Sequence, residues 1–145
     1  MATTYTVDAS VFLNAFNRYE AGHEQSNRLL RQMQDEAVPI IVPGLLLPEV
    51  AAAVARGRDD ADLARGFAVQ LSRLPHLILV PVDDRLAKQA ADIAAQHRLR
   101  GADAVYASVA LRFGSTLVTL DEEQRQRIGQ VIPTRLPAEA LSEWA

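Results

Sequence analysis

Short apolar runs alternate with longer segments of helical periodicity along the whole chain. The runs are Tyr5–Asp8, Ile40–Val42, Leu77–Val82, Thr116–Leu120 and, more weakly, Val131–Thr134. Their continuous apolar character is typical of strands buried on both faces of a parallel sheet. The longest helical segments between them are Leu45–Ala55, Leu63–Leu74, Leu86–Ala95 and Ala102–Phe113. Strands that alternate with helices require crossover connections, so the sequence predicts an α/β fold with a doubly wound sheet.

The length and the breakers indicate one domain that spans residues 1–145. A chain of 145 residues with 49% hydrophobic residues can bury a real core. We find no linker, internal repeat or low-complexity tract. Asp83 and Asp84 are good N-caps for a helix over Arg85–Arg98. The segments Leu45–Ala55 and Asp59–Leu74 are separated only by Gly57 and its neighbours, which predicts a helical hairpin on one side of the sheet.

Composition narrows the environment and the chemistry. The chain has no cysteine, which excludes disulfides, thiolate metal sites and thiol nucleophiles. The first residues lack a basic segment followed by an apolar stretch, and no apolar run is long enough to span a bilayer. We therefore expect a soluble, cytoplasmic protein without membrane contact.

Four acidic residues occupy positions where a carboxylate is costly unless its charge is compensated. Asp8 and Asp121 each end an apolar strand, Asp103 begins an apolar helix, and Glu49 lies among Leu, Val and Ala residues. Ligands of open parallel sheets bind beyond the carboxyl ends of the strands, where strand order reverses. If the first and fourth strands are neighbours, all four side chains can face one crevice.

Oxygen ligands of this kind suit Mg²⁺ or Mn²⁺, and the chemistry that follows is phosphodiester hydrolysis. We assign Asp8, Asp103 and Asp121 to direct or water-mediated metal binding. Glu49 is either a further ligand or the residue that orients the attacking water. Ser10 and Thr119 each lie two residues from one of the Asp residues and can orient the carboxylates.

Each acid also has an ordinary structural explanation. Asp8 and Asp121 can be helix N-caps, since Glu122 and Glu123 after Asp121 are typical of an acidic helix start. Asp103 can cap its own helix, and Glu49 can reach solvent from a helix edge. The four explanations are not independent, however, and the joint pattern favours a site.

The basic residues bear on an RNA partner. The net charge of −3 is unusual for a nucleic-acid binder. If the four candidate ligands are left out of the 18 acidic residues, 14 remain against 15 basic residues, and the net charge becomes +1. Only one basic residue is Lys; the arginines suit bidentate phosphate contacts or reflect a GC-rich genome. We nominate Arg98 and Arg100 for RNA contact, with Arg56 and Arg58 as second choice. Solvated helix ends explain these four residues nearly as well.

Two other families that use a strand-end Asp fit less well. A haloacid-dehalogenase-like phosphatase needs a second Asp two residues after the first, where this chain has Ser10. A receiver domain needs a Lys near its last strand, and the only lysine is Lys88. The three His residues show no metal-ligand spacing.

In their order, the acidic motifs resemble those of the PIN-domain ribonucleases, especially the VapC-type toxins of toxin–antitoxin pairs. The matching stretches are Val7–Leu13, Leu47–Ala51, Leu99–Ala107 and Leu117–Asp121. The resemblance covers nearly the whole chain. It implies a three-layer α/β/α sandwich with a mainly parallel five-stranded sheet. It also implies Mg²⁺ or Mn²⁺ held by the residues that match Asp8, Glu49, Asp103 and Asp121.

The resemblance further implies endonucleolytic cleavage of RNA such as tRNA or rRNA, a homodimer, and inhibition by a cognate VapB-type antitoxin. Leu45–Leu74 is the candidate antitoxin or dimer surface, although core packing explains most of its apolar positions. Many relatives carry a further Asp or Asn shortly after the last ligand. Here Glu122, Glu123 and Gln124 follow, which leaves the number of metal ions open. The alternative function is a non-catalytic RNA- or protein-binding module of the same fold.

Overall fold

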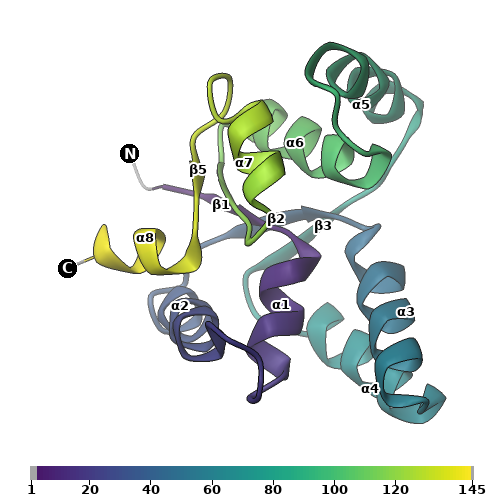
Figure 1. Ribbon diagram of the computed structural model, residues 1–145, viewed down its shortest axis with the longest axis vertical. Coiled ribbons are helices and arrows are strands. Elements are labelled where there is room, and N and C mark those ends of the chain that lie inside the picture. The colour runs from purple at the N-terminus through teal and green to yellow at the C-terminus, as the bar shows by residue number, and fades with distance from the viewer. Residues whose placement is uncertain (1–2, 145) are drawn as a thin grey trace.

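The computed structural model describes residues 3–144, which form a five-stranded sheet covered by helices on both faces (Figure 1). The strands are β1 (Tyr5–Val7), β2 (Ile40–Pro43), β3 (Leu77–Val80), β4 (Thr116–Val118) and β5 (Thr134–Arg135). Their order across the sheet is β3-β2-β1-β4-β5, and every neighbouring pair is parallel. The predicted α/β class and parallel sheet are confirmed.

The strands follow the apolar runs, with two differences at the edges of the sheet. The strand predicted over Leu77–Val82 ends at Val80, because Pro81 has no N–H with which to continue the ladder. It is also an edge strand, so Ile78 is 48% exposed rather than buried on both faces as predicted. The last strand begins at Thr134, not Val131, because Val131 donates its backbone N–H to Ile128 in the turn that precedes the strand.

Within residues 3–144, eight helices connect and follow the strands. They are α1 (Ala9–Phe16), α2 (His23–Asp35), α3 (Leu46–Arg58), α4 (Ala61–Ser72), α5 (Asp84–His97), α6 (Gly101–Phe113), α7 (Glu122–Ile128) and α8 (Pro137–Ser142). Figure 1 shows α5, α6 and α7 on one side of the sheet and α1 to α4 on the other. These are the three predicted layers. No helix within residues 3–144 is long and apolar enough to cross a membrane.

The predicted helical hairpin is present, but its first helix does not end at Gly57. Helix α3 continues through Gly57 to Arg58, and the chain reverses at Asp59, which adopts a left-handed conformation with φ of 50°. The next residue, Asp60, caps α4 by accepting a hydrogen bond from the Leu63 N–H at 3.0 Å. Two polar residues that tolerate turn geometry therefore provide the reversal.

A short loop connects α5 to α6. Asp83 caps α5, as predicted, and Asp84 is the first helical residue. At the other end of α5, the left-handed residue is Arg98 with φ of 56°, whereas Gly101 is the first residue of α6. The short loop between the helices therefore consists of Arg98, Leu99 and Arg100, and Leu99 is buried in the core.

The apolar pattern predicts no helix after the last strand, but the structure has α8 there. Proline at the first turn of a helix costs no hydrogen bond, and here it begins α8. Trp144 follows and stacks on Tyr5 of β1, with ring centroids 5.4 Å apart. This contact anchors the C-terminal segment on β1.

Strand order reverses between β1 and β4. From β1 the chain adds β2 and β3 on one side and later β4 and β5 on the other. The carboxyl ends of β1 and β4 therefore lie side by side, with Val7 paired to Val118. The sheet opens its crevice at this edge, where Asp8 and Asp121 follow the two strands.

Candidate active site

Asp8 lies at the carboxyl end of β1 and is the N-cap of α1. Its Oδ1 accepts hydrogen bonds from the Ser10 N–H at 2.9 Å and from the Ser10 hydroxyl. Its Oδ2 accepts one from the Thr119 hydroxyl at 2.5 Å. Ser10 and Thr119 thus bind one carboxylate together from two adjacent strand ends. Thr119 does not contact the Asp121 carboxylate; its hydroxyl instead accepts the Asp121 N–H at 3.0 Å.

The Asp8 carboxyl group is buried, with only 5% of the residue exposed. Burial raises the pKa of Asp8 from its ordinary value of 3.8 to about 6, although the hydrogen bonds from Ser10 and Thr119 lower it. The negative charge of Asp103 raises it further. Three hydrogen bonds therefore fail to offset the cost of desolvating this charge, and a nearby cation would stabilise it.

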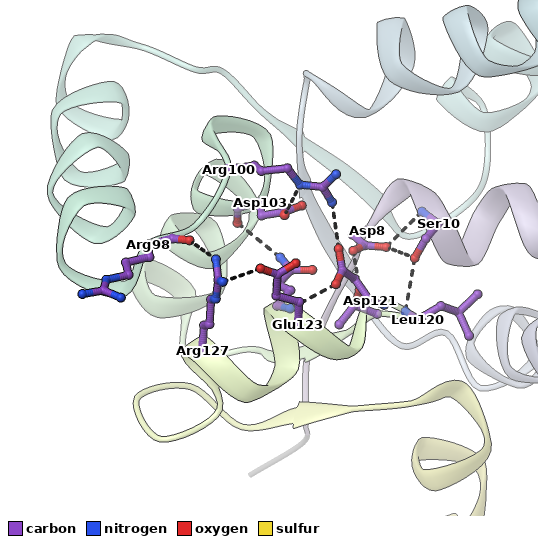
Figure 2. A network of polar contacts seen from close by, with 11 residues as sticks. Asp8, Ser10, Arg98, Arg100, Asp103, Leu120, Asp121, Glu123 and Arg127 are labelled. Carbon is purple, nitrogen blue, oxygen red and sulfur yellow. Dashed lines mark hydrogen bonds and ion pairs between the residues drawn. The ribbon is translucent and has the colours of Figure 1, made fainter.

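Asp103 and Asp121 share one arginine. Asp103 lies in the first turn of α6. Asp121 is the N-cap of α7, and its Oδ1 accepts a hydrogen bond from the Gln124 N–H at 3.1 Å. Arg100 Nε donates to Asp103 Oδ2 at 3.1 Å, and Arg100 Nη2 donates to Asp121 Oδ2 at 2.7 Å (Figure 2). Burial raises the pKa of Asp103, and Arg100 opposes that rise.

Glu49 lies in the first turn of α3 and is half-buried. Burial raises the pKa of Glu49, and the nearby charge of Asp103 raises it further. The Tyr106 hydroxyl faces Glu49 and lowers its pKa as a hydrogen-bond donor, although neither Glu49 Oε1 nor the Tyr106 oxygen has a partner of full hydrogen-bond geometry within residues 3–144. Burial raises the pKa of the Tyr106 hydroxyl above its ordinary range, and the charges of Glu49 and Asp8 raise it further. Glu49 is therefore close enough to Asp103 for their charges to interact. Tyr106 is close to both Glu49 and Asp8, so it lies between these two carboxyl groups.

The donor set of these four residues suits a divalent cation. It consists only of carboxylate oxygens, which Mg²⁺ and Mn²⁺ prefer. Three of the carboxyl groups have raised pKa values because burial disfavours their charge, and Glu49 Oε1 is unpaired. As the side chains stand, no three Asp, Glu, His or Cys residues in the described part of the chain are arranged to hold a metal ion. Arg100 is the cation in contact with Asp103 and Asp121.

The other nominated arginines lie differently. Arg98 is exposed, and its backbone carbonyl accepts a hydrogen bond from Arg127, which also pairs with Glu123 (Figure 2). Arg58 lies over the Phe16 ring at 5.5 Å. It ends α3, about 13 Å of helix beyond Glu49. Arg56 and Arg58 are therefore worse placed than Arg98 and Arg100 for a substrate at the acids.

Sequence reasoning missed Tyr106 and Gln124, and it nominated Arg100 for RNA contact but not as a partner of the acids. Arg100 bridges two acids, Tyr106 faces Glu49, and Gln124 is buried and donates to the Asp103 carbonyl at 3.3 Å. The sequence offered one usable signal: Arg100 lies three residues before Asp103, a spacing at which helical side chains meet. The roles of Tyr106 and Gln124 depend on tertiary contacts with no local pattern.

Comparison with protein families gives one match. The family model described as "PIN domain" matches residues 5–129, which include all four acids. A search of curated proteins gives no match.

Solved structures share the fold at low sequence identity. VapC20 from Mycobacterium tuberculosis, described as a sarcin-ricin loop cleaving toxin, has a TM-score of 0.71 and 19% identity, over 85% of this chain and 94% of that chain. FitAcB from Neisseria gonorrhoeae has a TM-score of 0.69 and 19% identity, over 92% and 98%. VapBC2 from Rickettsia felis, bound to a DNA fragment from its promoter, has a TM-score of 0.69 and 15% identity, over 92% and 98%. The predicted fold class is confirmed by these similarities.

Proposed function

Because the chain belongs to the PIN-domain family, we propose that it is a metal-dependent endoribonuclease and the toxin of a type II toxin–antitoxin system. The observation that carries the proposal is the burial of the Asp8 carboxyl group. This buried carboxylate is held by two hydroxyl groups, pairs with no basic side chain among residues 3–144, and lies at the strand ends where the sheet opens. A structural N-cap alone has no need of such burial.

The proposed roles follow from position. Asp8, Asp103 and Asp121 hold Mg²⁺ or Mn²⁺ directly or through water, and Glu49 is a further ligand or orients the attacking water. A bound divalent cation supplies a water of lowered pKa and neutralises charge on the scissile phosphate. Ser10 and Thr119 fix the Asp8 carboxylate in one orientation. No side chain needs to act as nucleophile.

RNA is the proposed substrate. Arg98 and Arg100 lie on the loop beside the acids, where guanidinium groups can bind the phosphates that flank the cleaved bond. VapC20, one of the structural neighbours, cleaves the sarcin-ricin loop. A structured RNA such as tRNA or rRNA is therefore the substrate class to test first.

A cleavage assay with matched variants tests the enzyme. Wild type, Asp8→Asn and Asp92→Asn are incubated with total RNA and Mn²⁺, with a parallel EDTA series. Asp92 is an exposed residue of α5, so its variant controls for the loss of one carboxylate. We expect fragmentation by wild type and Asp92→Asn only, and only with Mn²⁺. Equal fragmentation by Asp8→Asn would refute the catalytic assignment. Metal binding without cleavage by any protein would favour the non-catalytic RNA- or protein-binding module.

The proposed protein partner is a VapB-type antitoxin that places an apolar helix in a groove between α1, α2 and α4. Phe12, Phe16, Leu30, Phe67, Leu71 and Leu74 line this groove, and Arg31 and Asp35 lie at its polar margin. Another solved structure of this fold, from Klebsiella pneumoniae, is described as a toxin-antitoxin complex. Three of the lining residues belong to α4 and its end, within the predicted surface Leu45–Leu74.

Copurification with the product of an adjacent small gene tests this partner. Phe67→Ser should weaken the complex, because it removes an apolar contact from the groove. Val69→Ser is the matched control, since Val69 is 44% exposed on the same helix and does not line the groove. Equal retention of the partner by both variants would exclude this groove. Sedimentation of the free protein tests the proposed homodimer.

A further inference from the structure

Two acids of the proposed metal site, Asp103 and Asp121, lie at the starts of helices, and both already bind the same arginine side chain. The Arg100 guanidinium donates from Nε to Asp103 and from Nη2 to Asp121, at 3.1 and 2.7 Å. Figure 2 shows both contacts, with the guanidinium reaching over the acids from the loop before α6. An arginine that pairs with two carboxylates compensates their negative charge, as a bound metal ion would.

The contacted oxygens are the ones that a metal ion needs. Asp121 uses Oδ1 to cap α7, where it accepts the Gln124 N–H, so Oδ2 is its outward oxygen. Arg100 binds this Oδ2. On Asp103, Arg100 binds Oδ2 as well. A divalent cation that binds the outward oxygen of Asp121 must therefore take it from the guanidinium or share it against the charge of Arg100, and a cation that also binds Asp103 lies beside the same charge.

The arginine is also the movable partner. Its side chain is 77% exposed, whereas those of Asp103 and Asp121 are 16% and 26% exposed. The Arg100 backbone is fixed as the N-cap residue of α6, where its carbonyl accepts the Ala104 N–H at 2.9 Å. The side chain can therefore turn into solvent without any change in the fold, while the acids remain in place.

We propose that Arg100 is an exchangeable counter-ion that competes with the divalent cation for Asp103 and Asp121 and so lowers the metal affinity of the free protein. This inference rests on the metal site of the proposed function. In the absence of metal, Arg100 holds the two carboxylates together against their mutual repulsion. Metal binding displaces its guanidinium into solvent, where it is free to contact a phosphate.

The size of the effect follows from the exposure of the arginine. An exposed ion pair changes an equilibrium constant by up to about five-fold. Loss of two such contacts should therefore tighten metal binding by up to about twenty-five-fold.

Calorimetric titration with Mn²⁺ at pH 7.5 tests the proposal on wild type, Arg100→Gln and Arg112→Gln. Arg112 is exposed in the last turn of the same helix, about 14 Å of helix from Asp103, so its variant measures the effect of removing a distant charge. We expect the dissociation constant to fall at least three-fold in Arg100→Gln and to stay near the wild-type value in Arg112→Gln. Arg100→Lys, which keeps the charge but not the fork of donors, should lie between wild type and Arg100→Gln.

Thermal unfolding gives a second readout that does not require activity. Without metal, Arg100→Gln should melt slightly below wild type, and Mn²⁺ should raise its melting temperature by more than it raises that of wild type. Equal or weaker Mn²⁺ binding by folded Arg100→Gln would overturn the inference and leave the metal site standing. Absence of Mn²⁺ binding in all four proteins would overturn the metal site and the inference together.

Discussion

Replacing Asp8 by Asn should stabilise the metal-free protein at neutral pH, although it removes a residue of the proposed site. The reason is the raised pKa of Asp8, which burial shifts from 3.8 to about 6. A carboxyl group with a raised pKa in the folded state binds its proton more tightly there than in the unfolded chain. Its protonation therefore favours folding below about pH 4, and that stability is lost as the pH rises to about 6.

The magnitude follows from the shift. A difference of about two pKa units corresponds to roughly 3 kcal/mol of free energy of unfolding, all of it lost above about pH 7. Asn carries no charge and can still accept from Ser10 through its oxygen, while its amide can donate to the Thr119 oxygen. We expect Asp8→Asn to recover about 1–3 kcal/mol, which raises the melting temperature by about 3–10 °C.

Differential scanning calorimetry in EDTA, at pH 7.5 and pH 4.5, measures the effect. The raised pKa values of Glu49 and Asp103 affect both proteins similarly, so the difference between wild type and Asp8→Asn isolates Asp8. The difference should be large at pH 7.5 and should fall to roughly a third of that value at pH 4.5, because the unfolded chain still ionises there while folded Asp8 is protonated. Asp92→Asn, on the exposed face of α5, should melt with wild type at both pH values. If Asp8→Asn melts at or below wild type at pH 7.5, the carboxylate is not strained by burial and the electrostatic argument for a cation fails.

Three further predictions concern metal binding and the fold. In thermal-shift assays, saturating Mn²⁺ should raise the melting temperature of wild type more at pH 7.5 than at pH 5, because protonated Asp8 is a poor ligand; an equal shift at both pH values would argue against Asp8 as a ligand. Asn14→Ala should lower the free energy of unfolding by about 2 kcal/mol in urea titrations, because the buried Asn14 amide binds Glu20, the Ala21 carbonyl and Ser26, whose hydroxyl would lose its acceptor. A loss under about 0.5 kcal/mol would contradict this. Trp144→Ala should cost about 1–2 kcal/mol through the loss of its stack on Tyr5, and an unchanged melting curve would show that the C-terminal segment contributes nothing to stability.

The sequence predicted the fold well where a local pattern carries the information. Continuous apolar runs located β1, β2 and β4 within two residues, because strands at the centre of a parallel sheet are buried on both faces. At the edges of the sheet, β3 also lies within two residues of its predicted range but is partly exposed rather than buried on both faces, and β5 begins three residues after its predicted start. Asp8, Asp103 and Asp121 could be nominated because charge interrupts apolar sequence. The ion pair from Arg100 to Asp121 joins residues 21 positions apart, and no local spacing encodes it.

The structural and functional explanations of the acids do not exclude each other. Asp121 caps α7 with one oxygen and directs the other to Arg100, so a single carboxylate fixes a helix start and offers a ligand. Asp8 likewise caps α1 while it carries a buried charge. Alanine substitution at either position would remove the cap, at about 1 kcal/mol, together with the charge. Asn is an equally good N-cap and removes the charge alone. Asp→Asn variants therefore separate catalysis from folding, and any loss of metal binding in Asp121→Asn can be assigned to the outward oxygen's charge rather than to an unravelled α7.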